Sequence, residues 1–190
     1  SDMIFALTDN TRLEVQKYLN KNSITVPNGV DLDLFKPDPT NVMVQSYIPN
    51  IVCVSRLEKG KGIECALHAM RLIAKRYPDS KLIVIGDGTI RQELENLTNT
   101  LEIEKNVEFI GEVLNSDIPK YLSSVNIYLL SSLREGFSVS LLEAMAFGLP
   151  IISTPVGIAP NVLNEWNNGY LVPVRDPHAI YEAVIKITEN

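Results

Sequence analysis

The sequence predicts an α/β protein built on a doubly wound parallel sheet. Short apolar runs alternate with longer segments of helical periodicity from about residue 50 to the end of the 190-residue chain. The apolar runs show no alternation of polar and apolar residues, which is the pattern of strands that are covered on both faces. A repeated order of strand, helix and strand places the helices on the two faces of such a sheet.

The first residues predict a small unit that precedes this alternation. An apolar run before Thr8 indicates a short strand, residues 9–19 indicate a helix capped by Thr8 or Asp9, and residues 24–26 indicate a second strand. The next stretch, residues 27–39, is dense in Pro, Gly, Asn and Asp. Because proline fixes φ, we interpret this stretch as a linker held to one path rather than as a flexible tether.

After the linker, six strands are expected, each followed by a helix. Asp176 and Pro177 suit the N-cap and the first position of the last helix, and Gly148 with Pro150 ends an earlier one. The expected strands cover residues 51–54, 82–85, 107–110, 127–130, 151–153 and 170–172, and the expected helices lie near residues 63–74, 90–101, 118–124, 138–148, 161–163 and 177–187.

Composition and charge narrow the range of functions. The chain is 45% hydrophobic and 21% charged, as in an ordinary globular protein with one core and a small appendage. A net charge of −6 argues against nucleic acid as the main partner. Cys53 and Cys65 lie in an apolar run and a helical pattern, so we expect two buried free thiols and a reducing, cytoplasmic environment. The sequence has neither a membrane-spanning stretch nor the basic and apolar regions of a signal peptide.

The stretch 133–148 carries the main candidate site. It follows the fourth strand of the expected sheet and leads into a helix, so it opens at the carboxyl edge, where ligands of open α/β folds bind. A helix N-terminus favours phosphate there, Gly136 allows a close backbone approach, and the Ser138 hydroxyl suits an N-cap. Glu135 lies before the expected helix and Glu143 lies about one turn inside it, so the two can reach the same cleft from different positions along the helix axis. Taken alone, both glutamates also fit solvated surface charges.

A second candidate loop, residues 55–62, follows the first strand of the expected sheet directly. It combines several cations with two glycines at the same carboxyl edge. Arg56 suits a bidentate contact with a diphosphate, and Lys61 suits a point-charge contact. A solvated loop explains the charges equally well, but the position after the first strand favours the diphosphate site.

Other motifs do not indicate a cofactor or a metal. Residues 86–88 (Gly-Asp-Gly) lack the third glycine of a dinucleotide fingerprint, since Arg91 stands in its place, and they suit a tight turn that keeps the cleft open. Residues 31–33 (Asp-Leu-Asp) resemble a metal-binding triplet, but no other residues complete a coordination shell, and such turns commonly hold Asx caps. His68 and His178 stand alone on helices, which favours structural roles. The sequence contains no phosphate loop of ATPases and no nucleophile elbow.

Short motifs are spread over nearly the whole chain. Each motif alone is weak evidence for a family, whereas the ordered set is strong evidence. The motifs are Val26-Pro27-Asn28-Gly29-Val30-Asp31 with Phe35, Ser55-Arg56 with Lys61-Gly62, Gly86-Asp87-Gly88, Phe109-Ile110-Gly111, Glu135-Gly136-Phe137 through Glu143-Ala144-Met145-Ala146, Gly148-Leu149-Pro150, Val156-Gly157 and Asn168-Gly169. The ordered set resembles the donor-binding, C-terminal half of a retaining glycosyltransferase of the GT-B fold, in the GT4 family (glycosyltransferase group 1). The resemblance implies a Rossmann-like domain.

The resemblance also implies a role for each candidate residue. Arg56 and Lys61 would neutralise the donor diphosphate and stabilise it as it leaves. Glu135 would contact the transferred sugar, and Glu143 would accept both ribose hydroxyls. No metal would be required, because the cations and the helix dipole replace it. The other substrate-binding positions would be Gly136, Phe137 and Ser138 at the helix start, Gly111, Val113 and Leu114 beside the base, and Gly86 and Gly88.

The implied reaction is retaining transfer of a hexose-type sugar from a nucleotide diphosphate sugar to an acceptor hydroxyl. A UDP-sugar is favoured by its frequency in the family. The departing phosphate would deprotonate the acceptor on the same face of the sugar. Such enzymes serve polysaccharide or glycoconjugate biosynthesis in the cytoplasm, and the resemblance leaves room for peripheral membrane contact of a full-length enzyme.

The chain departs from the family pattern in two ways. After Gly157, where members often have a second glycine and a glutamate, it reads Ile158-Ala159-Pro160-Asn161, so the resemblance does not assign sugar or phosphate contacts to that loop. Residues 1–37 resemble only the last elements of an N-terminal acceptor domain plus the linker, and residues 38–190 resemble the donor-binding domain. We therefore expect part of a longer enzyme, which binds a nucleotide or nucleotide sugar weakly and transfers nothing alone.

Two other classes of function remain open at this point. A nucleotide-sugar epimerase or a phosphorylase uses a related two-domain fold. A non-catalytic nucleotide-sugar-binding module would keep the same cleft as a regulator or a partner surface.

Overall fold

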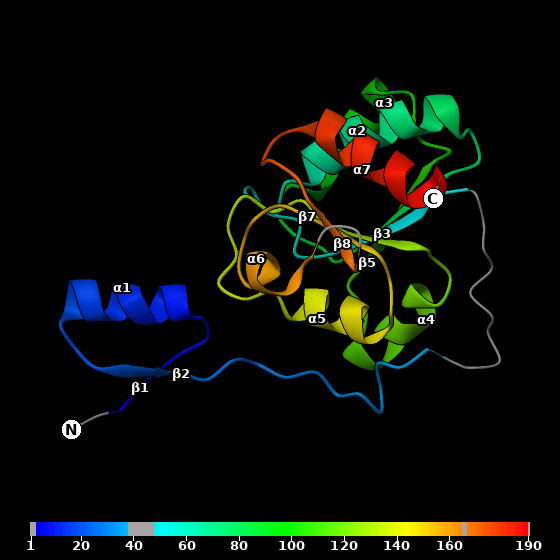
Figure 1. The fold of residues 1–190 in the computed structure, drawn as a ribbon. Coiled ribbons are helices and arrows are strands. Elements are labelled where there is room, and N and C mark those ends of the chain that lie inside the picture. Colours follow the sequence, from blue (N-terminus) through cyan, green and yellow to red (C-terminus); the bar gives the residue numbers. More distant parts are fainter. Residues whose placement is uncertain (1–2, 38–47, 165–166, 190) are drawn as a thin grey trace.

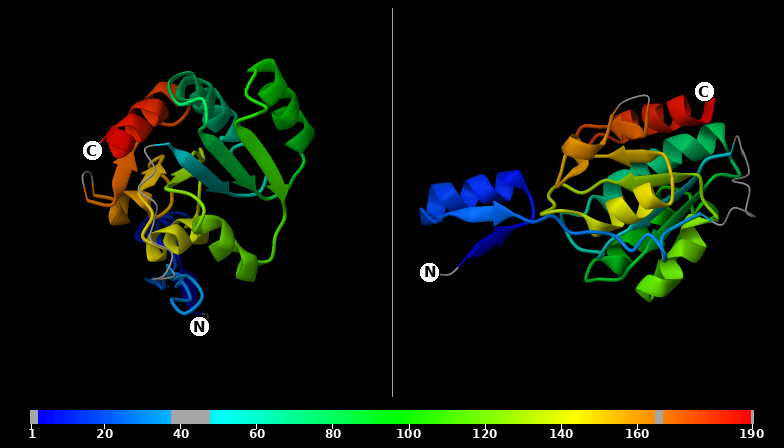
Figure 2. Two further views of the ribbon diagram at one scale, coloured as in Figure 1. Left: turned by 90° about the vertical axis from the view of Figure 1, so that its right-hand side faces the viewer. Right: turned by 60° about the horizontal axis from the view of Figure 1, so that its bottom comes forward.

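The computed structural model describes residues 3–37, 48–164 and 167–189. The larger part is a six-stranded sheet covered by helices, and a small N-terminal part of one helix and two short strands projects from it (Figures 1 and 2). In chain order the elements are β1 (Ile4–Ala6), α1 (Asp9–Leu19), β2 (Ser23–Thr25), β3 (Asn50–Val54), α2 (Ile63–Arg76), β4 (Lys81–Ile85), α3 (Arg91–Thr100), β5 (Val107–Gly111), the 3-10 helix η1 (Asn115–Asp117), α4 (Ile118–Leu122), β6 (Ile127–Leu130), α5 (Val139–Ala146), β7 (Ile151–Ser153), α6 (Ala159–Val162), β8 (Gly169–Leu171) and α7 (Pro177–Glu189).

The strands of the large sheet all run parallel, in the order β5-β4-β3-β6-β7-β8. The chain enters the sheet at β3, moves outward to β5, and returns to β6 on the other side of β3. This is the strand order of a Rossmann fold, with the switch point between β3 and β6. The predicted doubly wound sheet of six strands is confirmed, and each predicted strand of this sheet lies within one residue of its observed bounds.

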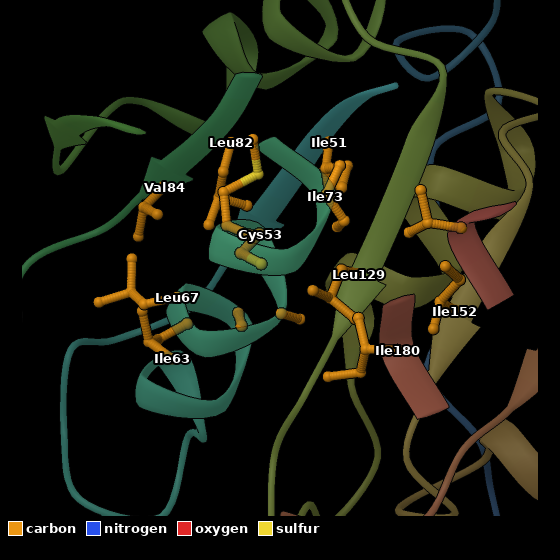
Figure 3. Packing of buried hydrophobic residues seen from close by; sticks show 14 of the residues in the cluster. Ile51, Cys53, Ile63, Leu67, Ile73, Leu82, Val84, Leu129, Ile152 and Ile180 are labelled. Atoms are coloured by element: carbon orange, nitrogen blue, oxygen red, sulfur yellow. The ribbon is translucent and has the colours of Figure 1, made fainter. Parts of the chain in front are cut away.

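Helices cover both faces of this sheet. Helices α2, α3 and α7 pack on one face, and α4, α5 and α6 pack on the other (Figure 1). In β3, Ile51 and Cys53 belong to the cluster under α2, whereas Val52 belongs to the cluster under α5. Figure 3 shows the first cluster, with Leu67 of α2 beside Val84 of β4. Burial on both faces explains why the strands read as unbroken apolar runs. Among the described helices, none is long and apolar enough to cross a membrane.

The starts of α1 and α7 follow the predicted capping signals. Thr8 and Asp176 each accept a hydrogen bond from the backbone N–H three residues further on, at 3.1 and 2.9 Å, and Pro177 begins α7. Helix α5 is different, because Ser138 precedes it with φ of 76° and its hydroxyl makes no capping hydrogen bond. The predicted Ser138 cap is therefore wrong, since a capping side chain needs extended backbone at its own position.

The described part of the linker runs along the part of the molecule that contains the six-stranded sheet. Phe35 is buried in the cluster under α5. Asp31 accepts hydrogen bonds from the N–H groups of Asp33 and Leu34, at 2.9 and 3.3 Å, which is the Asx-type turn predicted for this stretch. The buried ring of Phe35 thus anchors the linker to the sheet domain, and Val30 and Leu34 pack against the same cluster. Residues 38–39 of the predicted linker lie outside the described residues.

Both cysteines are free thiols, as predicted, but only one is fully buried. Burial raises the pKa of Cys53 to about 12. Cys65 is half-buried, and burial together with the negative charges of Asp176 and Glu64 raises its pKa to about 11. Such pKa values disfavour the thiolate, so neither cysteine is an activated nucleophile.

Candidate functional site

The two predicted loops meet at the switch point of the sheet. They follow β3 and β6, which are neighbours at its centre. Leu133 donates a backbone hydrogen bond to the carbonyl of Gly60 at 2.8 Å. At Gly62, which has φ of 68°, an added Cβ would lie 2.0 Å from the carbonyl oxygen of Ser131. Only glycine therefore allows the loops to approach so closely.

An ion pair between these loops forms the centre of the site. Lys61 Nζ lies 2.8 and 3.0 Å from the two carboxylate oxygens of Glu135, and these side chains are only 20% and 14% exposed. Ser132 Oγ donates to Glu135 Oε1 at 2.7 Å, and Thr154 Oγ1 donates to the Ser132 carbonyl at 2.5 Å. A cation and a carboxylate are thus held in fixed positions at the carboxyl edge. Neither Ser132 nor Thr154 was predicted from the sequence, where the one signal for each is a hydroxyl within two residues of the end of an apolar strand.

The backbone between Glu135 and α5 leaves donors free. Gly136 is exposed, with open space where a Cβ would stand, while the Phe137 side chain is buried and anchors the turn. Among the described residues, no protein group accepts a hydrogen bond from the backbone N–H groups of Gly136, Phe137 or Ser138. The left-handed backbone of Ser138 is strained for a residue with a side chain, and such strain clusters at functional sites. Free N–H groups beside a helix N-terminus suit phosphate or hydroxyl oxygens.

Glu143 is a buried carboxylate close to this turn. It lies on α5, is 6% exposed, and accepts a hydrogen bond from Asn115 Nδ2 at 2.9 Å. Burial raises the pKa of this carboxyl group, and the Asn115 hydrogen bond lowers it. In the part of the chain that the structure describes, Glu143 has no cationic partner. The alternative of a solvated surface glutamate is therefore wrong, and a buried acid without a cation is a candidate ligand-binding group.

A cavity of about 690 Å³ opens beside the loops that follow β3, β4 and β5. Arg56, Gly86, Gly88 and Val113 are among the residues that line it. An added Cβ at Gly86 or Gly88 would lie 2.0 or 2.3 Å from backbone carbonyl oxygens of the loop after β3. The glycines therefore let two loops pack closely and shape one wall of a cavity that is large enough for a small ligand.

Three other predicted residues, Arg56, Gly111 and Leu114, take no part in the Lys61–Glu135 ion pair. The Arg56 side chain is 73% exposed and donates to Glu58 Oε1 at 2.7 Å, so it borders the cavity and takes no part in the Lys61–Glu135 pair. Gly111 ends β5 with φ of 86°, and its carbonyl accepts a hydrogen bond from Gly86 at 2.8 Å. Leu114 is exposed and does not line the cavity.

Neither the two histidines nor a metal-binding cluster of the described residues forms part of the site. His68 and His178 are exposed on α2 and α7, which cover one face of the sheet. Within residues 3–37, 48–164 and 167–189, no group of three or more His, Cys, Asp or Glu side chains is placed to hold a metal ion.

The fold and the site together define a Rossmann-like domain of the kind found in GT-B glycosyltransferases. The chain belongs to the family Glycosyl transferases group 1, whose model matches residues 48–190. This confirms the family identified from the sequence. Among solved structures, HepE from Anabaena in complex with UDP and glucose superposes with a TM-score of 0.87 at 20% identity, over all of this chain and 54% of that one. At that identity the likeness shows the fold alone.

The curated relatives are longer proteins that match this chain over part of their own length. A phosphatidylinositol N-acetylglucosaminyltransferase subunit from Arabidopsis thaliana is 36% identical over 140 residues, which are 74% of this chain and 31% of that protein. N-acetyl-alpha-D-glucosaminyl L-malate synthase of Bacillus anthracis is 30% identical over 197 aligned residues, covering all of this chain and 51% of that protein. The chain therefore spans between about a third and a half of these relatives.

Proposed function

We propose that this chain is the donor-binding half of a retaining GT4 glycosyltransferase, which takes a nucleotide diphosphate sugar as its donor. The observation that carries the proposal is the Lys61–Glu135 ion pair at the switch point, beside free backbone N–H groups. One cation and one carboxylate at that place suit the two halves of such a donor, because the diphosphate needs positive charge and the sugar needs hydrogen-bond acceptors.

Each part of the donor has a candidate partner. Lys61, with Arg56 at the cavity, neutralises the diphosphate, while the N–H groups of residues 136–138 bind phosphate and sugar hydroxyls. Glu135 accepts hydrogen bonds from the sugar, and Glu143 accepts the ribose hydroxyls. The base enters the cavity beside Glu112 and Val113. A UDP-sugar with a hexose-type sugar is the favoured donor, and the complexes of HepE with UDP-glucose and of pneumococcal GtfA with UDP and GlcNAc support this choice.

In the proposed reaction, the bond between the anomeric carbon and the phosphate oxygen breaks while the acceptor oxygen attacks the same face. The acceptor proton passes to the departing phosphate oxygen, so the products are the glycosylated acceptor and the nucleoside diphosphate. Lys61, Arg56 and the N-terminus of α5 stabilise the negative charge that grows on the leaving group, so we propose that the reaction needs no metal.

The small N-terminal part suits a role as the end of a separate acceptor domain. Phe5 of β1 and Ile24 of β2 are paired in register and are 62% and 48% exposed. Two strands with a bare apolar face are not stable alone, so the face fits against further strands or helices. The C-terminal domain of LpcC from Francisella tularensis matches 85% of this chain and 94% of its own length at 26% identity and a TM-score of 0.67, which supports a separate domain that makes up most of this chain.

The cellular setting is part of the same proposal. We place the enzyme in the cytoplasm, in polysaccharide or glycoconjugate biosynthesis, with peripheral membrane contact through the acceptor domain. Relatives whose names include phosphatidylinositol support a membrane-bound acceptor.

Titration of the 190-residue chain with UDP, GDP and ADP tests the proposal directly. We expect one nucleotide to bind and Glu143→Ala to abolish binding, with no sugar transfer by this chain alone. Binding that survives Glu143→Ala would favour a non-catalytic module with a different site. Conversion of the sugar without an acceptor would instead indicate an epimerase, and robust transfer by the isolated chain would refute the division into two domains.

A further inference from the structure

Asn115 connects the loop after β5 with helix α5, and both segments carry proposed nucleotide contacts. It begins η1, directly after residues 111–114, of which Glu112 and Val113 line the cavity. Its side-chain amide donates to Glu143 Oε1 at 2.9 Å, although the two residues stand 28 positions apart on different elements. The hydrogen bond therefore ties the loop after β5 to the buried carboxylate on α5.

The contact leaves the rest of the carboxylate open to a ligand. Among the described residues, Asn115 is the only protein group that donates a hydrogen bond to Glu143, and it occupies Oε1 alone. Each carboxylate oxygen has two acceptor sites, so Oε2 and one site on Oε1 are free for hydroxyl donors. Asn115 is exposed whereas Glu143 is buried, so the hydrogen bond between them reaches from the surface to the buried carboxylate.

Without its amide partner, Glu143 would lose both its orientation and part of its charge. A glutamate side chain turns about several bonds, and one hydrogen bond at Oε1 selects the arrangement in which Oε2 stays free. The same hydrogen bond lowers the pKa of a carboxyl group whose pKa is raised by burial, which helps to keep it ionised as an acceptor for two hydroxyls.

We propose that Asn115 is a positioning residue that holds Glu143 for the 2′ and 3′ hydroxyls of the donor ribose, and thereby makes the site select ribonucleotides over 2′-deoxyribonucleotides. This inference rests on the proposed function, because it takes Glu143 as the ribose contact. It adds that recognition of the sugar hydroxyls depends on the loop that flanks the base.

Calorimetric titration of four forms of the chain tests the inference. The forms are wild type, Asn115→Ala, Glu143→Gln and the double variant, each titrated with UDP, GDP, ADP and their 2′-deoxy counterparts. We expect Asn115→Ala to weaken binding of the preferred ribonucleotide roughly 5- to 10-fold and to leave its 2′-deoxy form nearly unchanged, so that the ribose preference falls. In the double variant, Asn115→Ala should weaken binding less than it does alone, because the neutral amide of the Glu143→Gln variant makes weaker hydrogen bonds to the hydroxyls that Asn115 helps to position.

Matched variants separate positioning from folding. Asn99→Ala, on an exposed position of α3, should bind like wild type. Asn115→Asp keeps the shape of the side chain but removes the donor and adds a like charge, so it should weaken ribonucleotide binding more than Asn115→Ala does. The unfolding midpoint in urea checks that every variant is folded.

The outcomes distinguish the two proposals. Failure of wild type to bind any of the three ribonucleotides would overturn both. Loss of binding in Glu143→Gln with an unchanged ribose preference in Asn115→Ala would overturn the role of Asn115 alone. Binding by Asn115→Asp as tight as wild type would do the same.

Discussion

Replacement of Glu143 by glutamine should make this chain more stable and a weaker nucleotide binder. Glutamine has the same shape and keeps an oxygen that can accept the hydrogen bond from Asn115. The substitution removes one negative charge from a buried residue, which is 6% exposed and has no cationic partner among the described residues.

The stability effect has a definite sign. Burial raises the pKa of Glu143 in the folded chain, so the folded state binds this proton more tightly than the unfolded state does. The ionised carboxylate therefore lowers the free energy of unfolding above the folded pKa, and this penalty disappears below the unfolded value of about 4.3. Glu143→Gln should raise the free energy of unfolding at pH 7, and the difference should shrink as the pH falls toward 4.

The affinity effect follows from the charge of the acceptor. Hydrogen bonds to charged groups contribute about 1.5–3 kcal/mol, and the variant replaces such bonds to the ribose hydroxyls by weaker neutral ones. If that whole contribution is lost, binding weakens about 10- to 150-fold. Urea unfolding at pH 7 and pH 4, with calorimetric titration of UDP at pH 7, measures both quantities. A variant that is less stable at pH 7, or that binds UDP as tightly as wild type, would refute the reasoning.

Three further substitutions probe the switch point, and a fourth is the matched comparison for the stability effect of Gly62→Ala. Lys61→Ala should weaken UDP binding about 10-fold or more while leaving the weak binding of uridine unchanged, because the lost contact is to the diphosphate; equal losses for both ligands in calorimetry would contradict this. Glu135→Gln should release Lys61, so that UDP binds at least as tightly as to wild type whereas UDP-glucose binds less tightly; a parallel change for the two ligands would exclude a sugar contact. Gly62→Ala should lower the free energy of unfolding by roughly 1–3 kcal/mol in urea, since its Cβ would meet the Ser131 carbonyl at 2.0 Å. Gly136→Ala has open space for its Cβ and should leave stability within about 0.5 kcal/mol, with weaker UDP binding as its signature.

The helices and strands were predictable because their signals are local. Apolar runs marked the six strands of the sheet to within one residue, and Asp176 with Pro177 marked the start of α7. The Ser138 cap failed because the residue type suits a cap, while its left-handed backbone is imposed by the turn after Glu135. One-turn helices are also weakly specified: α6 begins at Ala159, two residues before the predicted start.

The sequence by itself determined the strand-helix alternation, the family, and the two loops that carry the candidate residues. Only the tertiary structure decided which of those residues meet: Lys61 pairs with Glu135 across 74 positions, Asn115 reaches Glu143 across 28, and Arg56 turns to Glu58 instead. The physical reason is that local propensity sets each strand, whereas the order and register of the strands set which loops become neighbours. That order places the loops after β3 and β6 side by side, although the whole of β4 and β5 lies between them in the chain.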